Sequence, residues 1–580
     1  MQLHARRRHA VARCRLLIAA AAVAMSLAAV LCFSRVDPAG LLVAPARALQ
    51  LVPARRLHVR LGAVKGTAAT AAPAAGRKSR SPPLETEAVL MPDWEVLVLL
   101  RPGAADDTGG NATCAFGRGA SSPARALGRL PASGRHAYLC LVPGPARRQR
   151  RLRAPRLVIA SSSSASMVST ATGGGKSPEI LRWSGRLVYE SAVVDGGDVL
   201  VFAKGVNPRQ GVNRAASDIR CVYYRRAGPG GDDGVVATLP AATSAQQVFR
   251  CPPPPSAAAS HELRVTLAVA GEDPLPSLAV YTPPRSGSSS TPAPEKKLIC
   301  ACTMVRDVAK FLPEWVVYHA AVGVDRFYLY DNGSEDDLED QVHRLNSAGY
   351  NISTVTWPWA KAQEAGFSHA AAVLREYCEW VAFVDVDEFI FSPRWNQSKA
   401  PTESMLRSIV STAKPDVGRV SLRCADFGPS GQTSNPKEGV TQGYTCRRRA
   451  EERHKSLLRL DAVDDSLLNS IHHFTLRPGF RVEWSKRVRV NHYKYQAWEE
   501  FKVKFRRRVS TYVADWTDPV NIQSKDRTPG LGFEAVKPVG WTHKFCEVND
   551  TLLHDATRRW FGFGFGNNLN LTARHTSSSS

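Results

Sequence analysis

Several short ligand-binding motifs are absent from this 580-residue sequence. Ten cysteines follow residue 33, but no two of them form a Cys-x-x-Cys pair, which argues against zinc ribbons and thioredoxin-type redox sites. GGGKS at 173–177 lacks the first glycine of a phosphate-binding loop, and GFGFG at 562–566 does not match the dinucleotide-binding pattern. The sequence therefore offers no nucleotide site of either kind.

Acidic residues are also scarce, since 52 Asp and Glu stand against 76 Lys and Arg and the net charge is +24. Such an excess is typical of nucleic-acid-binding proteins. However, residues 1–160 hold 25 Lys and Arg against 7 Asp and Glu, which accounts for 18 of these charges. The rest of the chain is only mildly basic, so we expect no nucleic-acid partner. The apolar content of 44% excludes a wholly disordered or collagen-like chain.

An uncharged apolar run, LLIAAAAVAMSLAAVLCF, occupies residues 16–33 and is just long enough for a helix to span a bilayer. Five arginines lie in residues 1–15, so the positive-inside rule predicts that this short tail is cytoplasmic. We expect an uncleaved single-pass type II transmembrane anchor, with a cleaved signal peptide as the alternative. In either case the remaining chain enters the secretory pathway.

Two other features agree with a secretory protein. Asn-x-Ser/Thr sequons begin at Asn111, Asn332, Asn351, Asn396, Asn549 and Asn570. The even number of cysteines after the anchor suggests disulfides. Cys221 with Cys251, and Cys424 with Cys446, would close short loops, but the sequence does not fix the pairing.

The middle of the chain divides by composition. Residues 34–87 are rich in Ala, Pro and Arg and show no periodicity, which predicts a flexible stem. Residues 88–283 contain short β-like runs between Gly- and Pro-rich stretches, as in an all-β module. These runs are Glu95–Leu100, Ala137–Val142, Asp198–Ala203, Ile219–Tyr224 and Glu262–Val269. Residues 284–297 have the composition of a linker.

After the linker, strands and helices are predicted to alternate, which indicates an α/β domain with a parallel sheet. The predicted strands are Leu298–Val305, Arg326–Tyr330, Ile352–Trp357 and Trp380–Val384, and the predicted helices are Phe311–Val322, Glu335–Ala348 and Glu364–Glu379. In such sheets ligands bind beyond the carboxyl ends of the strands. Asp385-Val386-Asp387 directly follows the last predicted strand and so falls at that end.

Asp385 and Asp387 would point to the same side of an extended segment. Two carboxylates in that arrangement suit a hard divalent cation such as Mg2+ or Mn2+, which neutralises a diphosphate. An Asp-x-Asp sequence alone is common, and a surface acidic turn is the competing interpretation. The position after a buried strand favours the metal site.

Longer motifs are more specific. CTMVRDVAKFLPEWVVYHAAVGVDRFYLYDNGSEDD at 302–337 and WVAFVDVDEFIF at 380–391 closely resemble plant members of glycosyltransferase family 92. The resemblance continues through DFGPSG at 426–431, Tyr444–Arg447 and VNHYKYQAWEEFKVK at 490–504. It implies a GT-A catalytic domain, which is Rossmann-like and binds a nucleotide sugar, at 298–560, with a C-terminal tail at 561–580.

The resemblance also implies an activity. Galactan synthases of this family transfer galactose from UDP-galactose in β-1,4 linkage with inversion, and carry an N-terminal β-rich carbohydrate-binding module. We therefore expect a Golgi enzyme with a lumenal catalytic domain, a UDP-sugar donor, a glycan acceptor and Mn2+ or Mg2+. The alternative is a non-catalytic carbohydrate-binding or scaffold protein of a cell-wall synthesis complex. The oligomeric state stays open, with a homodimer as one option.

The resemblance assigns site residues as well. It implies that Arg306, Asp307 and Asp331 contact the nucleotide, and that Asp385 and Asp387 hold the metal and diphosphate. A histidine near the C-terminus completes the metal site in many such enzymes, and His492 is the first choice, with His472 and His473 as alternatives. The family pattern has Asn-Glu after the first-strand arginine, whereas this sequence has Asp307-Val308.

The catalytic base is not singled out by spacing. An inverting transfer needs a base to take the proton of the attacking acceptor hydroxyl. Asp426 and Glu451, which flank the segment that resembles the acceptor region, are the candidates. Trp357 and Trp359 are candidates for stacking on a sugar or a nucleobase, with a place in the core as the alternative.

Overall fold

The computed structural model describes residues 86–100, 112–117, 119–159, 168–169, 179–208, 211–225, 234–255, 262–283, 295–504 and 537–565. All of these belong to one compact unit that begins at Arg80. The predicted cytoplasmic tail, the predicted anchor at 16–33 and nearly all of the predicted stem lie outside these residues. Within the described ranges, no helix is both long enough and apolar enough to cross a membrane.

The first part of the described chain is an eight-stranded sheet with the order β7-β6-β3-β4-β5-β2-β1-β8. Its strands are β1 (Thr86–Leu90), β2 (Glu95–Leu100), β3 (Ala112–Ala115), β4 (Ser121–Arg129), β5 (His136–Leu141), β6 (Arg156–Ile159), β7 (Val168–Ser169) and β8 (Leu181–Arg182). A short helix, α2 (Gly144–Arg147), follows β5. Neighbouring strands are antiparallel apart from β1 and β8, which are parallel.

Two four-stranded sheets follow. One contains β9 (Leu187–Val193), β10 (Val199–Lys204), β13 (Thr243–Ala245) and β14 (Val248–Cys251), and the other β11 (Ile219–Arg225), β12 (Gly234–Pro240), β15 (Leu263–Val269) and β16 (Val280–Tyr281). Both sheets contribute to one buried apolar cluster, so they form a sandwich. The Cys221–Cys251 disulfide joins β11 to β14 across it. The β-like runs predicted from the sequence coincide with strands here and in the eight-stranded sheet.

The second half is an α/β domain built on a nine-stranded sheet, with the order β19-β18-β17-β20-β24-β22-β28-β21 and with β27 beside β22. The strands are β17 (Lys297–Val305), β18 (Arg326–Asp331), β19 (Ile352–Thr356), β20 (Cys378–Phe383), β21 (Glu388–Phe391), β22 (Val417–Asp426), β24 (His454–Arg459), β27 (Arg481–Trp484) and β28 (Arg489–His492). The helices are α3 (Leu312–Val322), α4 (Leu338–Ser347), α5 (Gln363–Val373), α6 (Ser404–Ser411), α7 (Val440–Gly443) and α9 (Leu552–Phe561). Two small ladders pair β23 (Cys446–Arg447) with β29 (Val548–Asn549), and β25 (Asn469–Ser470) with β26 (His473–Phe474).

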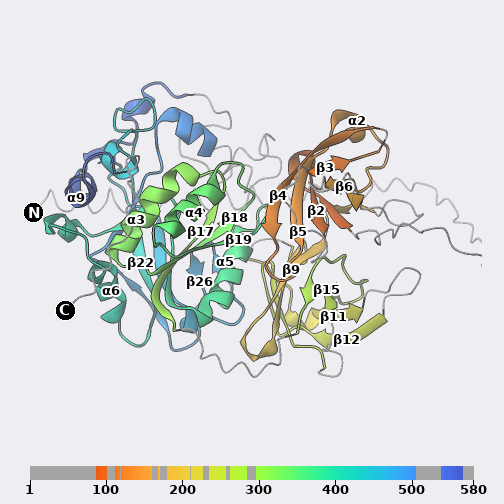
Figure 1. Cartoon of the computed structure of the whole chain (residues 1–580). Helices are drawn as coiled ribbons and strands as arrows, with labels where there is room; N and C mark the ends of the chain where they lie inside the picture. The colour runs from red at the N-terminus through yellow and green to blue at the C-terminus, as the bar shows by residue number, and fades with distance from the viewer. Residues whose placement is uncertain are drawn as a thin grey trace, which may run out of the picture. The chain divides into compact units, whose positions relative to one another are not determined.

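Helices cover both faces of this sheet (Figure 1) because its central strands are apolar on both sides. On β17, Ile299 and Ala301 belong to the buried cluster that contains the apolar side of α3. The intervening Cys300 and Cys302 belong to the cluster that contains the apolar side of α5. Because both faces are covered, ligands are expected beyond the carboxyl ends of the parallel strands.

The four strands predicted from the sequence, β17, β18, β19 and β20, pair in parallel as expected. β27 and β28 also run parallel to β22. β24 runs antiparallel to both β20 and β22, so the sheet is mixed. The predicted helix at Glu364–Glu379 is also too long, because α5 ends at Val373. Cys378 already pairs with Lys297 in the sheet and forms a disulfide with Cys300, and these long-range contacts override the local helical pattern.

Of the two pairings that the sequence left open, Cys221–Cys251 forms and Cys424–Cys446 does not. Cys446 is bonded to Cys546, 100 residues away, while Cys424 is a buried free thiol on β22. The remaining disulfide of the described part of the chain joins Cys114 to Cys140. Burial raises the pKa of Cys424 well above its ordinary value, so its thiol stays protonated.

Candidate functional site

The Asp-Val-Asp segment lies at the carboxyl end of β20, as the sequence predicts. β20 ends at Phe383, and the backbone N–H of Glu388 donates to the carbonyl of Asp385 at 3.0 Å. Residues 385–388 therefore form a turn that leads into β21. The expectation of an extended segment with both carboxylates on one side is not met, and Asp385 and Asp387 have different partners.

Asp385 faces a buried lysine from the neighbouring strand β24. Lys455 Nζ lies 2.7 Å from Asp385 Oδ2 and 2.9 Å from Glu388 Oε2, and the lysine side chain is only 8% exposed. Burial alone would raise the pKa of Asp385, but the charge and hydrogen bond of Lys455, together with His472, lower that pKa to about 2. Glu388 also accepts the backbone N–H of Asp385 at 2.9 Å, so this glutamate caps the turn.

His472 is engaged by the same lysine. Its Nε2 lies 2.6 Å from Lys455 Nζ, and because an ammonium can only donate, Nε2 accepts and the proton sits on Nδ1. Burial, and then the Lys455 charge, lowers the pKa of His472 well below its ordinary value. His473 contacts Ser456 and stacks on His454. The His472 nitrogen nearest to Asp385 is therefore occupied by Lys455.

Asp387 faces His492 instead. His492 Nε2 lies 3.3 Å from Asp387 Oδ2, and His492 Nδ1 lies 3.0 Å from Asp426 Oδ1. Lys504 forms an ion pair with the same oxygen of Asp387. Burial would lower the pKa of His492, but Asp387 and Glu388 together raise it above its ordinary value. Asp387, His492 and Asp426 thus form a hydrogen-bonded chain that links the turn to β28 and β22.

This chain has the chemistry of a divalent metal site. Adjacent ligands of an octahedral ion with bonds of about 2.1 Å lie about 3 Å apart, close to the separation of Asp387 Oδ2 and His492 Nε2. Asp426 fixes the imidazole so that Nε2 faces the aspartate, as a carboxylate does behind a metal-bound histidine. No cluster of three or more His, Cys, Asp or Glu ligands is preformed within the described ranges. The residues that suit a divalent metal ion are therefore Asp387 and His492, whereas Asp385 is ion-paired with Lys455.

The two candidates for the catalytic base differ in their surroundings. Asp426 is 4% exposed and is held by both His492 and Lys494, whose Nζ lies 3.0 Å away. Burial opposes ionisation, but these two partners hold the pKa of Asp426 well below its ordinary value. Asp426 therefore suits positioning of His492 better than proton abstraction. Glu451 is partly exposed. In the described part of the molecule it forms no hydrogen bond or ion pair with Asp387, His492 or Asp426.

The three residues implied in nucleotide contact lie in the loops after β17 and β18. Asp331 Oδ1 accepts the backbone N–H and the hydroxyl of Ser334, at 2.8 and 2.7 Å. Asp307, whose φ is +49°, accepts the backbone N–H of Glu335 at 2.6 Å. Arg306 lies beside Asp307 and stays partly exposed. The Asp307–Glu335 hydrogen bond thus links the loops after β17 and β18. Because β17 lies between β18 and β20 in the sheet, the loop after β17 is next to the turn at the end of β20.

Arg125 of β4 reaches this loop from the eight-stranded sheet. Its guanidinium donates to the carbonyl of Ser334 at 2.6 Å and to that of Gly333 at 3.3 Å, and it lies 3.4 Å from Glu335 Oε1. Thr356 at the end of β19 donates to the carbonyl of Leu127 on the same strand β4. The N-terminal sheet therefore supports the loop that carries Asp331.

Trp357 and Trp359 do not line the site. Both are fully buried, where Trp357 packs edge-on against Phe202 and Trp359 stacks on Trp183. Their apolar contacts connect α5 and β19 with the β-rich region in one cluster. The core alternative is correct for these two residues, and stacking on a ligand is excluded by their burial.

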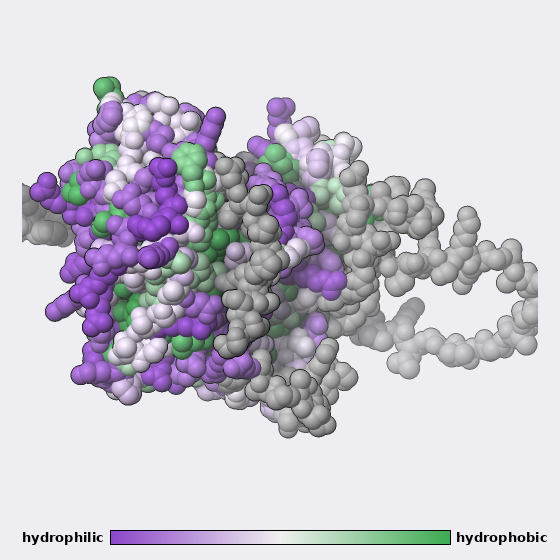
Figure 2. Space-filling view, turned by 60° about the vertical axis from the view of Figure 1, so that its left-hand side comes forward, coloured by the Kyte–Doolittle hydropathy of each residue, from purple (hydrophilic) through white to green (hydrophobic). Residues whose placement is uncertain are grey.

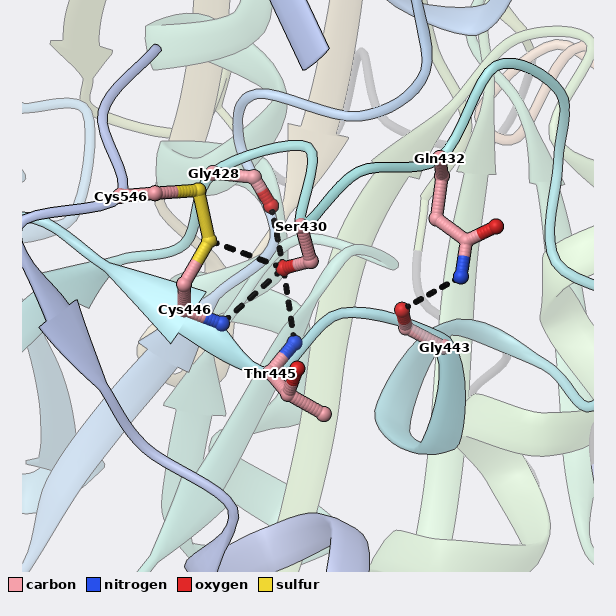
Figure 3. The surroundings of a disulfide bond; sticks show 7 residues. All are labelled: Gly428, Ser430, Gln432, Gly443, Thr445, Cys446 and Cys546. Atoms are coloured by element: carbon pink, nitrogen blue, oxygen red, sulfur yellow. Dashed lines mark hydrogen bonds between the residues drawn. A yellow bond between two sulfur atoms is a disulfide. The ribbon is translucent and has the colours of Figure 1, made fainter. Parts of the chain in front are cut away.

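The DFGPSG segment is organised around the Cys446–Cys546 disulfide (Figure 3). The Ser430 hydroxyl accepts the backbone N–H groups of Thr445 and Cys446 at 2.8 and 3.0 Å. A Cβ on Gly428 would lie 2.8 Å from Cys546 Sγ, so only glycine fits there. These contacts hold β22 against β23, and the motif therefore fixes the strand end that presents Asp426.

Lys455 and Lys504 also belong to the site, although no sequence pattern singles them out. Lys455 occupies a mostly apolar strand, HKSLLR, and a lysine in such a strand is a weak signal of a buried charge with a partner. Its partners are 67 and 70 residues away, so no local pattern reveals them. Lys504 falls within the motif at 490–504, but nothing in its spacing relates it to Asp387.

Comparison with known proteins comes from sequence and from fold. The profile of glycosyltransferase family 92 matches residues 295–523. A family 92 protein of Oryza sativa subsp. japonica is 40% identical over 82% of this chain and 80% of its own length. Family 92 proteins of Ricinus communis and Arabidopsis thaliana are 45% and 42% identical, over 65% and 66% of this chain and 67% of each relative.

Solved structures with partial similarity include residues 1–349 of S. aureus TarS in complex with UDP, at 10% identity and a TM-score of 0.22 over 37% of this chain and 67% of that chain. Another is glucosyl-3-phosphoglycerate synthase of Mycobacterium tuberculosis with Mn2+ and UDP, at 12% identity and a TM-score of 0.17 over 29% and 58%. Scores this low support no argument about substrates.

Proposed function

Because the chain belongs to glycosyltransferase family 92, we propose that it transfers a hexose, galactose, from a UDP-sugar to a glycan acceptor of the β-1,4-galactan type with inversion. We further propose that it acts in the Golgi lumen, anchored by residues 16–33. The observation that carries the proposal is the Asp387–His492–Asp426 chain at the carboxyl end of β20, where α/β sheets bind ligands.

In the proposed reaction, the acceptor oxygen bonds to the anomeric carbon as the bond from that carbon to the diphosphate oxygen breaks. The acceptor proton passes to a base, and UDP leaves. Mn2+ or Mg2+, when bound, supplies neutralisation of the departing diphosphate. Asp387 and His492 would hold the ion, and Asp426 would orient His492. Lys455 keeps Asp385 ionised beside it.

A donor screen tests this proposal. The full chain is incubated with Mn2+, β-1,4-galacto-oligosaccharides and each of several UDP-sugars, and product is followed by mass spectrometry. We expect an added hexose with UDP-galactose and none without metal. Binding of the oligosaccharide with no turnover of any donor would contradict the proposal and favour a non-catalytic carbohydrate-binding or scaffold protein.

A further inference from the structure

A group of stacked side chains lies beside the site, and none of its members takes part in the Asp387–His492–Asp426 chain. Arg423 of β22, His454 of β24, His473 of β26 and Trp484 of β27 form it, and we call it the His–Trp platform. The rings of His454 and His473 stack at 3.8 Å between centroids, and those of His454 and Trp484 lie 4.7 Å apart. Arg423 Cζ lies 5.3 Å from the centre of the Trp484 ring.

The platform is exposed. Trp484 is 47% accessible, and Arg423 is exposed as well. Polar side chains cover most of the face shown in Figure 2, and only Trp94 and Trp484 are exposed tryptophans among the described residues. The exposed area of the Trp484 ring is apolar surface that a bound partner can bury.

The platform is positively charged and has no acid of its own. Within the described part of the chain, no carboxylate forms an ion pair with Arg423. Burial, and then the charges of Arg419 and Arg423, lowers the pKa of His454, and burial, His454 and Arg419 lower that of His473 to about 3. Both imidazoles are thus neutral near pH 7. A guanidinium that stacks on a ring keeps its edge N–H groups free for a carboxylate.

The platform also adjoins the reaction centre. His473 follows His472, whose Nε2 lies 3.7 Å from Asp385 Oδ2, and the two imidazole centroids are 6.3 Å apart. His454 precedes Lys455, which binds Asp385. A chain of contacts therefore leads from Trp484 through His454, His473 and His472 to the turn that carries the aspartates.

We propose that the His–Trp platform is an acceptor subsite that binds a uronate unit of the glycan acceptor, with the sugar ring against the aromatic side chains and its carboxylate on Arg423. This inference rests on the proposed function, because it identifies part of the acceptor. Neutral rings that offer an apolar face, next to one unpaired guanidinium, match the chemistry of an acidic pyranose. A neutral sugar would leave the guanidinium without its anionic partner.

Binding of trigalacturonate and of β-1,4-galactotriose to the full chain, measured by isothermal titration calorimetry, tests the proposal. We expect trigalacturonate to bind more tightly than the neutral galactotriose. Its affinity should fall as the salt concentration is raised, because salt screens charges. Arg423→Gln and Trp484→Ala should each weaken its binding about tenfold, because each removes a stacking or charge-assisted contact. Trp484→Phe should bind within a few-fold of the unchanged chain, since it keeps an aromatic face.

Two matched controls locate the effect. Arg487→Gln removes another exposed arginine of the α/β domain, and Trp94→Ala removes the other exposed tryptophan, which also carries a stacked arginine, Arg147. Both should bind trigalacturonate as the unchanged chain does. Equal affinity for the neutral and acidic sugars, unchanged binding in Trp484→Ala, or loss in Trp94→Ala would overturn the subsite.

The melting temperature of each variant separates loss of binding from loss of folding. Turnover of UDP-galactose by the unchanged chain is measured separately. If turnover fails while platform-dependent uronate binding holds, the proposed function is wrong and the binding site stands. If turnover holds while trigalacturonate binds independently of Trp484, the subsite is wrong and the transferase stands.

Discussion

At the scale of single residues, the site depends on which partner each charged group has. Asp385 and Asp387 are two positions apart, yet the first is paired with Lys455 and the second with Lys504 and His492. The Asp-x-Asp pair could be predicted from its place after an apolar strand. The buried lysine could not, because only the antiparallel pairing of β20 with β24 brings it to Asp385.

Asp426→Asn tests the positioning role argued for this residue. The amide can donate to His492 and so favour the other tautomer, which turns Nε2–H toward the metal ligands. Loss of such a partner lowers metal affinity about 10- to 100-fold. We expect activity to require correspondingly more Mn2+ and to recover at high Mn2+. Asp461→Asn, at an exposed position, serves as the control.

If Asp426 is instead the base, the same variant would behave differently. Its rate at saturating Mn2+ would stay low, because no added metal replaces a proton acceptor. A Mn2+ titration of the initial rate therefore separates the two roles. If the rate of Asp426→Asn stays low at saturating Mn2+, the positioning role is contradicted.

At the scale of elements, the local sequence predicts those strands and helices that are set by local apolar patterns. β17, β18, β19 and β20 begin and end within about two residues of their predicted bounds, because each apolar run is bordered by polar residues. The antiparallel strands β22 and β24 and the early end of α5 depend on distant partners. The same holds for Cys446, whose disulfide partner lies 100 residues away.

The contact between β4 and the loop after β18 gives a prediction at this scale. Arg125→Ala removes two hydrogen bonds to loop carbonyls and one ion pair, which leaves the loop of Asp331 less constrained. We expect UDP to bind roughly 3- to 10-fold more weakly, with a smaller change in kcat. Calorimetric titration of UDP with and without Mn2+ measures the effect.

Arg220→Ala is the control for this prediction. Arg220 is exposed on β11 and donates only to a carbonyl three residues away in the contacts of the described chain, that of Ser217. It should leave UDP affinity unchanged. Equal UDP affinity in Arg125→Ala and in the unchanged chain would show that the N-terminal sheet has no part in organising the nucleotide loop.

At the scale of the whole molecule, the β-rich region and the α/β domain share a buried cluster that includes Trp183, Phe202, Trp357 and Trp359. The sequence indicated both regions by their different periodicities. It did not indicate that the tryptophans of the TWPWAK segment connect the two regions, because the same pair of aromatic residues is compatible with a buried core and with a ligand site. Their burial shows why the β-rich region cannot be treated as a separate appendage.

The proposed lumenal location predicts a specific glycosylation pattern. The Asn332 side-chain amide donates to the carbonyls of Trp357 and Trp359 at 2.7 and 3.1 Å, so it is not available for a glycan. Asn351 and Asn549 are exposed. We expect glycans at these two asparagines and none at Asn332, by mass spectrometry of glycopeptides from the full chain expressed in plant cells.

Site-directed controls accompany that measurement. Asn351→Gln and Asn549→Gln should each remove one glycosidase-sensitive mass increment, and Asn332→Gln should remove none. An unglycosylated protein at both exposed sequons would contradict a lumenal location. A glycan on Asn332 would contradict the hydrogen bonds that engage its amide.

The central claim is that Asp387 and His492 make this chain a metal-dependent glycosyltransferase. Transfer of galactose from UDP-galactose to a galacto-oligosaccharide, measured against Mn2+ concentration for the unchanged chain and for Asp387→Asn, tests it most directly. The account predicts Mn2+-dependent transfer by the unchanged chain and a loss of at least about 100-fold in Asp387→Asn, with the melting temperature retained. Transfer by Asp387→Asn at the unchanged rate, or transfer that continues after metal is chelated, would contradict it.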